Sequence, residues 1–183
     1  MVSVDEIEEK CSGILCGNKK TSCADQLAKA VRMASKKENE NTWIKPYKRE
    51  YYPEISSIWL ETNIKAHNFI DEEYWIKNKD VFKKGVEEAT VYVYFDEVVK
   101  GFIGLSENYI AGLFVKDTFQ NKGIGYALLE KAKETKEFLT LDVYEKNKNA
   151  VKLYLKNGFV IEKTFIDKNT NSKTFRMSWK RGI

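Results

Sequence analysis

The segment from Leu113 to Gly125 combines residue types that suit a phosphate group. An apolar run ends at Val115, and Gln120-Asn121-Lys122-Gly123-Ile124-Gly125 then leads into a stretch with the apolar spacing of a helix. The first turn of a helix has backbone N–H groups without partners inside the helix, and its dipole favours negative charge. Glycines there let phosphate oxygens approach the backbone, and Lys122 adds a positive charge. The segment is therefore predicted to bind a pyrophosphate.

The two glycines are weak evidence by themselves, because an ordinary glycine-containing turn has the same composition. The chain has no G-x-x-x-x-G-K-S/T and so no Walker loop, and the third glycine of a dinucleotide fingerprint is missing. The pattern of the following residues has to decide between a plain turn and a binding loop.

A second segment whose residue types could take part in catalysis runs from Leu141 to Phe159. Asn147 precedes a helical pattern in which Tyr154 lies one turn beyond Ala150 on the same face. A phenol can donate a proton or a hydrogen bond to a departing group as charge develops on it. The alternatives are a core aromatic at Tyr154 and a plain helix N-cap at Asn147.

Together the two segments resemble the GNAT superfamily of acetyl-CoA-dependent N-acetyltransferases. Gln120-x-x-Gly123-x-Gly125 is similar to the acetyl-CoA motif Q/R-x-x-G-x-G/A of that family. Leu141-Asp142-Val143, Asn147–Tyr154 and Asn157-Gly158-Phe159 are similar to its second element, L-x-V…N-x-x-A-x-x-L-Y…x-G-F. The resemblance covers roughly residues 42–180.

The resemblance implies acetyl-CoA as co-substrate. The pantetheine arm would enter a gap between two splayed strands and pair with one of them like an added strand. The loop amides would hold the pyrophosphate, and Tyr154 would protonate the departing thiolate. The cofactor-binding residues implied in this way are Leu113, Phe114, Val115, Gln120, Asn121, Lys122, Gly123, Ile124, Gly125, Asn147, Ala150 and Tyr154.

The base that takes a proton from the acceptor amine has several candidates. Asp142 occupies a place where some family members carry an acid that they use as a base, although a solvent-facing strand residue is the favoured interpretation. Other acids near expected acceptor loops are Glu72, Glu73, Glu97 and Glu107. His67, the only histidine, follows a segment that resembles one wall of the acceptor site in a bacterial GNAT subgroup. It could be a base or a substrate contact, or a partly exposed loop histidine. A chain of water molecules would also serve.

The elements that must position these residues form a mixed α/β (α+β) domain. The predicted order is strand, two helices, three strands, helix, strand, helix and two strands, without the regular alternation of a doubly wound sheet. The second helix is expected to start at Asp71 and end at Gly85, and Gly112 predicts a bulge or a close approach within its strand. The resemblance implies a mostly antiparallel sheet with a V-shaped splay between its two central strands and helices on both faces.

Residues 1–41 are predicted to form a helical hairpin appendage and linker, and residues 42–183 the acetyltransferase domain. Ser3 with Glu6, and Ser22 with Asp25, have the spacing of helix N-terminal caps. The three cysteines, Cys11, Cys16 and Cys23, are an odd number and lie close together, so we expect reduced thiols rather than a disulfide framework.

Composition limits the class of partner. The formal net charge of +4 is too small to argue for nucleic acid, although it suits an anionic ligand. No stretch approaches the ~20 apolar residues of a membrane span. The first residues are acidic and contain no basic region followed by an apolar run, so a secretory signal is not expected and a cytoplasmic location is. One histidine and three clustered cysteines complete no known metal-ligand spacing.

The predicted function is direct transfer of an acetyl group from acetyl-CoA to a primary amine of a small molecule or of a protein or peptide. One alternative is a non-catalytic acyl-CoA-binding regulatory module, with the N-terminal hairpin as its output surface. Another is an interaction protein in which residues 1–37 mediate formation of a homodimer. Tyr154 favours the enzyme, because binding alone needs no proton donor. Acceptor choice has no readable code in the sequence.

Overall fold

The structure is a computed structural model of the chain, and it describes residues 10–12, 24, 26–27 and 43–182. The chain divides into two compact units, Met1–Trp43 and Ile44–Ile183. The predicted helical hairpin and the predictions for Cys16 and Cys23 lie outside the described residues, apart from short helical pieces at residues 10–11, 24 and 26–27. Cys11 is a free, partly exposed thiol. The following description concerns the second unit.

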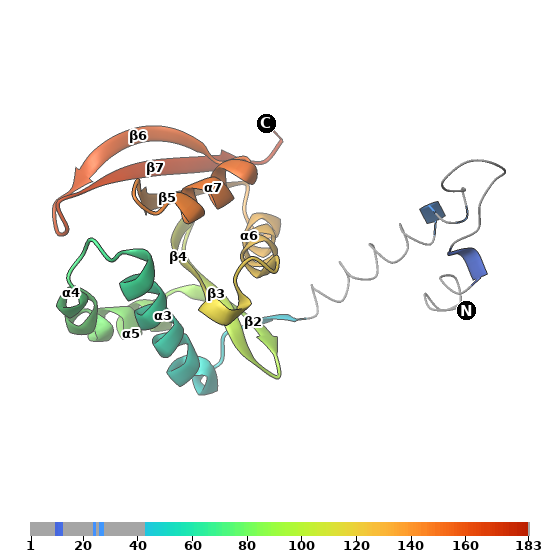
Figure 1. The fold of residues 1–183 in the computed structure, drawn as a ribbon, viewed down its shortest axis with the longest axis horizontal. Helices are drawn as coiled ribbons and strands as arrows, with labels where there is room; N and C mark the ends of the chain where they lie inside the picture. The colour runs from blue at the N-terminus through green and yellow to red at the C-terminus, as the bar shows by residue number, and fades with distance from the viewer. Residues whose placement is uncertain (1–9, 13–23, 25, 28–42, 183) are drawn as a thin grey trace. The chain divides into compact units, whose positions relative to one another are not determined.

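A mixed sheet organises the second unit (Figure 1). Its described strands are β1 (Ile44–Pro46), β2 (Thr90–Asp96), β3 (Val98–Ser106), β4 (Tyr109–Val115), β5 (Phe138–Tyr144), β6 (Val160–Asp167) and β7 (Ser172–Lys180). They lie in the order β1-β2-β3-β4-β5-β7-β6. The β4–β5 pair is parallel, and every other neighbouring pair is antiparallel. The predicted mixed, mostly antiparallel sheet is confirmed.

Helices cover both faces of this sheet, as predicted. On one side lie α3 (Tyr52–Ala66), α4 (Glu72–Lys77) and α5 (Lys79–Glu88), and on the other lie α6 (Ile124–Glu134) and α7 (Lys148–Lys156). Alternation along β3 divides the core between them: Phe102 packs in the α3–α5 cluster, while Ile103 and Leu105 pack in the α6 cluster. Both faces of the central strands are therefore buried.

The prediction of one helix from Asp71 to Gly85 is wrong in its extent. Asp71 does cap a helix, because its Oδ1 accepts the Glu73 N–H at 2.8 Å. That helix ends at Asn78, whose side-chain amide donates to the Tyr74 carbonyl at 2.7 Å and so competes with the helical ladder. A separate helix, α5, then continues through Gly85 to Glu88. Gly85 has helical geometry and does not terminate the element.

A bulge next to Gly112 separates the two central strands. Gly104 pairs with Gly112 and Leu105 with Ile110, so Ala111 is the extra residue on β4. The parallel β4–β5 pairing stops after Ile110 and Leu141. Beyond that point β4 continues along β3 and β5 continues along β7. The predicted V-shaped splay is thereby confirmed, and the bulge is the irregularity that Gly112 predicted.

Gly112 is required by its neighbour in the same strand. A Cβ at this position would lie 2.3 Å from Cε2 of the Phe114 ring. That ring stacks on Phe102 with centroids 5.0 Å apart. The missing side chain at Gly112 therefore lets Phe114 fold back over the strand at the start of the splay.

In the part of the chain that the structure describes, no helix is long and apolar enough to cross a membrane.

Candidate active site

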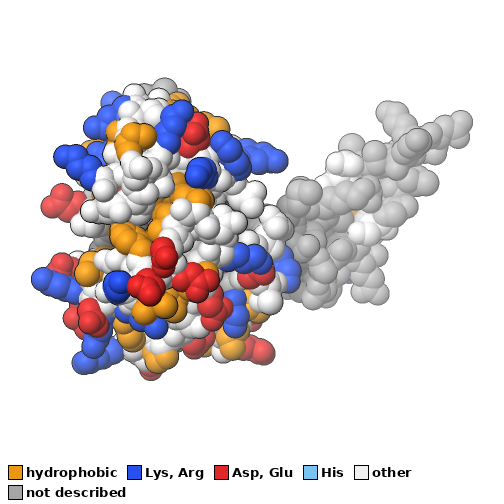
Figure 2. Space-filling model, turned by 60° about the vertical axis from the view of Figure 1, so that its left-hand side comes forward, with side chains coloured by type: hydrophobic (Ala, Val, Ile, Leu, Met, Phe, Trp, Pro, Cys, Tyr) orange, Lys and Arg blue, Asp and Glu red, His pale blue; other side chains and the backbone are white. Residues whose placement is uncertain are grey.

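A groove of about 1060 Å³ opens where β4 and β5 separate. Its walls come from the end of α3, the splayed parts of β4 and β5, the loop before α6 and the start of α7, with further side chains from α4 and from the β6–β7 hairpin. Figure 2 turns the left side of Figure 1 forward and shows hydrophobic side chains exposed across the middle of the domain, with charged side chains above and below them. Most of the site residues predicted from the sequence line this groove.

The β4 side of the groove offers an unpaired strand edge. Lys116 donates its N–H to the Lys100 carbonyl at 2.9 Å, so its backbone faces β3. Backbone groups of an antiparallel ladder alternate in direction, and those of Leu113 and Val115 therefore face the gap. An extended ligand could pair there as an added strand. The Val115 carbonyl already accepts a hydrogen bond from Gln120 Nε2 at 3.0 Å.

The loop after β4 ends at the start of α6. A short 3-10 turn, η2 (Asp117–Phe119), is followed by Gly123, which has a φ of 87° and is the N-cap of α6. Apart from the residues next to it in the chain, no described atom lies within 4 Å of the place where its Cβ would be. Gly123 thus combines a left-handed backbone with open space in front of it, as a phosphate-binding turn requires.

The first turn of α6 has free donors. No side chain caps Gly123, and the Ala127 N–H makes the first bond into the helix, to the Gly123 carbonyl at 2.9 Å. The N–H groups of Ile124, Gly125 and Tyr126 precede that bond and have no partner within the helix. This end of the helix is therefore ready to bind an anion.

Two details of the predicted loop differ from the expectation. The Gln120 N–H is already bonded to the Asp117 carbonyl at 3.1 Å, so Gln120 contributes its side chain to Val115 rather than a free amide to the groove. Lys122 donates from Nζ to the Thr118 carbonyl at 3.0 Å and lies over the Phe119 ring. Lys122 therefore folds over the loop while keeping its charge near the helix start.

Asn147 is the N-cap of α7 and lines the groove. Its Oδ1 accepts the Ala150 N–H at 3.2 Å, and its Nδ2 lies 3.2 Å from Nε2 of His67. The N-cap interpretation is therefore confirmed. Because Nδ2 carries two hydrogens, one donor remains for a ligand in the groove.

Tyr154 lies on the same helix and lines the groove. It is only 6% exposed, its ring centroid is 5.6 Å from that of Phe159, and it borders the groove. Burial, with a smaller effect of the neighbouring Tyr109, raises the pKa of its phenol. Tyr154 is thus a core aromatic that also faces the groove and stays protonated across the physiological range.

Asp142 does not face solvent as a free strand residue. Arg176 binds both of its carboxylate oxygens, Nε to Oδ1 and Nη2 to Oδ2, each at 2.6 Å. The Tyr109 hydroxyl lies 3.4 Å from Oδ2. Burial raises the pKa of Tyr109 to about 12, and the Asp142 charge adds to this. A carboxylate held in this way is poorly placed to accept a proton from an incoming amine.

His67 is a partly buried histidine in the turn that follows α3, in agreement with the interpretation as a loop histidine. It is the C-cap of α3, and its ring stacks on Trp75 with centroids 5.3 Å apart. Burial lowers the pKa of the imidazole to about 4, and a smaller effect of the Asn63 backbone opposes this shift. The ring is therefore neutral at pH 7, and Asn147 is its hydrogen-bonding neighbour.

The sequence did not indicate that Tyr109 and Arg176 contact the Asp142 side chain. Arg176 lies opposite Asp142 in the β5–β7 register, but this neighbourhood depends on β7 being inserted between β5 and β6. The one sign in the sequence was that Arg176 occupies a polar position between the apolar residues Phe175 and Met177 of an alternating strand. Such a pattern marks an outward-facing position and does not reveal its partner.

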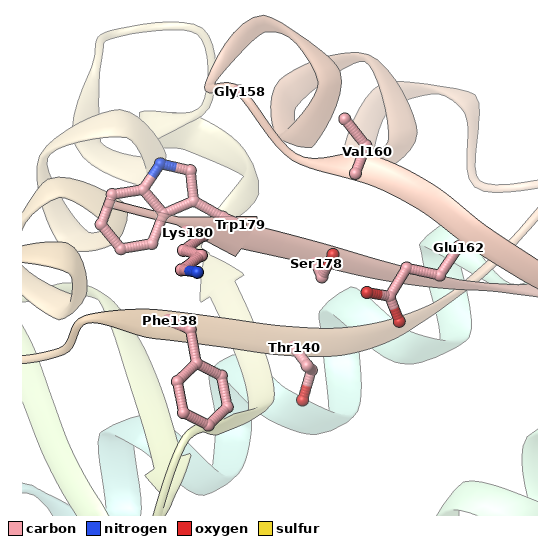
Figure 3. A pocket seen from close by; sticks show the side chains of 8 residues that line it. All are labelled: Phe138, Thr140, Gly158, Val160, Glu162, Ser178, Trp179 and Lys180. Atoms are coloured by element: carbon pink, nitrogen blue, oxygen red, sulfur yellow. The ribbon is translucent and has the colours of Figure 1, made fainter. Parts of the chain in front are cut away.

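A second hollow, of about 560 Å³, lies elsewhere on the sheet (Figure 3). Its side chains come from β5, β6 and β7, and include Phe138, Thr140, Val160 and Ser178. It shares no residue with the large groove. Within the described residues, no group of three or more His, Cys, Asp or Glu side chains could hold a metal ion.

Comparison with known proteins relates this geometry to a family. Residues 87–161 match the family model of the acetyltransferase (GNAT) domain, and residues 1–35 match that of the TSCPD domain. The chain is 30% identical over 139 residues to the peptidyl-lysine N-acetyltransferase YiaC of Escherichia coli strain K12, a match that spans 74% of this chain and 95% of YiaC. The chain belongs to the GNAT family of acetyltransferases.

Solved structures agree with this assignment. The solution structure of apo YjaB from Escherichia coli matches this GNAT enzyme with a TM-score of 0.66 and 26% identity, over 74% of this chain and 95% of YjaB. The structure of yncA from Salmonella typhimurium, solved with its cofactor acetyl-CoA, has a TM-score of 0.55 and 15% identity over 75% of this chain and 92% of yncA. At that identity yncA shares the fold with this GNAT protein.

The match to the GNAT domain model covers the main parts of the groove. It begins in α5 at Glu87 and ends in β6 at Ile161, so it includes the splay, the Gly123 turn and Tyr154. It excludes α3, α4, most of β6 and all of β7. The family match identifies the chain as an acyltransferase enzyme. The other walls of the groove lie outside the matched region.

Proposed function

We propose that this enzyme transfers an acetyl group directly from acetyl-CoA to the side-chain amine of a lysine in a peptide or protein. The observation that supports acetyl-CoA as the cofactor is that one groove contains both a strand edge and a helix start. The strand edge is that of Leu113 and Val115, and the helix start is the uncapped first turn of α6 beside Gly123. An extended arm with amide groups suits the strand edge, and a pyrophosphate suits the helix start.

The acceptor class rests on the relatives. YiaC and YjaB are named peptidyl-lysine N-acetyltransferases, and YjaB is 30% identical over 120 residues. The lining of the groove includes the acidic residues Glu61, Asp117, Asp142 and Asp167, of which Asp117 is paired with Lys65 and Asp142 with Arg176.

In the proposed reaction, the neutral amine nitrogen attacks the thioester carbonyl. The new N–C bond forms as the C–S bond breaks, the nitrogen releases a proton, and the sulfur gains one. We assign donation to the sulfur to Tyr154, because its raised pKa keeps the phenol protonated until the thiolate departs. Alanine at position 150, one turn before Tyr154, leaves room on the groove side of α7.

We assign no catalytic proton transfer to Asp142 or His67. Asp142 is occupied by Arg176, and the Nε2 of His67 is occupied by Asn147. Water in the open groove would take the proton from the acceptor amine. Asp142 would then keep the β5–β7 wall in place rather than act as a base.

We also propose that catalysis belongs to residues 42–183 and that residues 1–41 form a separate appendage. The boundary between compact units after Trp43 and the separate TSCPD match over residues 1–35 support this division.

Thiol release from acetyl-CoA tests the proposal. Lysine-containing peptides, the same peptides with the lysine side chain already acetylated, and free primary amines would be compared at equal concentration. Release that requires the free lysine amine supports a peptidyl-lysine acceptor. Release with small amines alone would contradict the acceptor class, and acetyl-CoA binding without release for any amine would favour the binding-module alternative.

A further inference from the structure

We propose that His67 is a positioning residue that holds the Asn147 side chain for the acetyl-CoA arm, and that it is not the general base. The inference rests on the proposed function, since it assigns Asn147 to the cofactor side of the groove. It starts from a contact between residues 80 positions apart, His67 Nε2 and Asn147 Nδ2, at 3.2 Å.

The orientation of the Asn147 amide follows from its backbone partner. The Ala150 N–H is a donor, so the atom that faces it at 3.2 Å must be the amide oxygen, Oδ1. The NH₂ group then points at His67 and donates to the lone pair of Nε2. The imidazole proton must therefore lie on Nδ1, and the two ends of the Asn147 amide are held by two different elements.

The His67 ring cannot easily turn away from this contact. Trp75 stacks on it at 5.3 Å, and Tyr144 and Phe69 meet it edge-on at centroid distances of 5.0 Å and 5.8 Å. Three aromatic side chains from three different parts of the fold thus fix the direction of Nε2. A hydrogen-bond acceptor held by its surroundings loses less entropy in orienting its partner than a mobile one would.

A histidine at this position has an unfavourable contribution to folding, because its Nδ1 is buried. Nδ1 has no partner at hydrogen-bond geometry among the described residues, although the Asn63 backbone has a weak effect on the ring. A phenylalanine would fill the same aromatic space without leaving a polar atom unsatisfied. The feature that a phenylalanine lacks is the acceptor at Nε2, and that acceptor is the atom directed at Asn147.

The contact also links the two sides of the groove. His67 ends α3, which packs on one face of the sheet, and Asn147 begins α7, which packs on the other. The lowered pKa of His67 agrees with this role, because a neutral imidazole keeps its lone pair free at pH 7. A protonated ring would present N–H groups on both sides and oppose the Asn147 donor.

Two substitutions separate positioning from base catalysis. His67→Phe keeps an aromatic ring between Trp75 and Tyr144 but removes the acceptor. His67→Gln offers a side-chain carbonyl that can accept from Asn147. We expect His67→Phe to raise the Kd and KM for acetyl-CoA about fivefold, the equivalent of one neutral hydrogen bond, and His67→Gln to recover most of that loss.

The measurements are acetyl-CoA titration calorimetry and steady-state kinetics over pH. A double-mutant cycle with Asn147→Ala completes the design, because a shared role makes the double variant no weaker in binding than Asn147→Ala alone. An unchanged Kd for His67→Phe, with kcat reduced about 100-fold or more and a pH limb lost, would overturn the inference in favour of a base.

Additive losses in the cycle would overturn it as well, since they would mean that the two residues act separately. These outcomes leave the proposed function intact, because acetyl-CoA binding and lysine-dependent release by the unsubstituted enzyme test it independently. Absence of acetyl-CoA binding by the unsubstituted enzyme would overturn both. Circular dichroism of each variant checks that the fold is retained, and His67→Gln keeps the test decisive if His67→Phe does not fold.

Discussion

Asp142 and Arg176 face each other across β5 and β7 and form a two-pronged ion pair, with both nitrogen–oxygen distances at 2.6 Å. The carboxylate raises the pKa of the Arg176 guanidinium. The pair lies at the splay, where β5 has left β4 and depends on β7 for its remaining backbone partners. The ion pair therefore helps to hold β5 against β7 in the part of the groove wall where β4 no longer pairs with β5.

The first prediction concerns this pair. Asp142→Asn removes the charge but keeps the shape, so the free energy of unfolding should fall by about 1–2 kcal/mol while kcat changes less than about threefold. Urea unfolding and thiol release are the measurements. Glu145→Gln is the matched control, because Glu145 is on the edge of the same wall and pairs with the exposed Lys173. A loss of kcat by about 100-fold or more in Asp142→Asn would instead make Asp142 the base.

The second prediction concerns the turn at Gly123. Gly123→Glu places a carboxylate in the open space before α6 and should abolish acetyl-CoA binding, because it repels the phosphates and occupies their place. Gly182→Glu is a control with the same change in charge and the same backbone strain, since Gly182 has a φ of 79° and open space around it. Calorimetry should detect binding in the control only. Retained binding in Gly123→Glu would place the phosphates elsewhere.

The third prediction concerns Tyr154. Tyr154→Phe keeps the buried ring against Phe159 and removes the proton donor, so kcat should fall about 100-fold while the Kd for acetyl-CoA stays within about twofold. Tyr92→Phe, a partly buried tyrosine outside the groove, is the control. Equal turnover in Tyr154→Phe and the unsubstituted enzyme would remove Tyr154 from the mechanism.

The fourth prediction concerns stability at low pH. His67 has a folded-state pKa of about 4 against an ordinary value of 6.5, so its burial as a neutral ring stabilises the fold fully above pH 6.5. As pH falls from 6.5 towards 4, the unfolded chain gains a proton that the folded ring resists, and this contribution, up to about 3 kcal/mol, is lost. Urea unfolding from pH 7 to pH 4 should therefore show a flatter pH dependence for His67→Phe. Identical slopes would mean that the ring is not held neutral.

Several parts of the fold could be predicted because their causes are local. The turn at Gly123 needs a glycine, the cap at Asn147 needs a short polar side chain, and Asp71 starts its helix through a contact two residues away. The splay was an implication of the family resemblance, with Gly112 as its local sign. The end of the second helix was misjudged because Gly85 is tolerated in a helix, whereas Asn78 can replace the helical ladder with bonds of its own.

The sequence by itself determined the chemistry of the groove: a glycine turn before a helix, an N-capping asparagine and a tyrosine one turn beyond Ala150. Each depends on residues a few positions apart, whose relation is set by the geometry of one turn or one helix. Only the tertiary structure decided that Arg176 occupies Asp142 and that His67 meets Asn147. Those pairs depend on strand order and on helices packing from opposite faces, which arise from burial of the whole core and have no short-range signal.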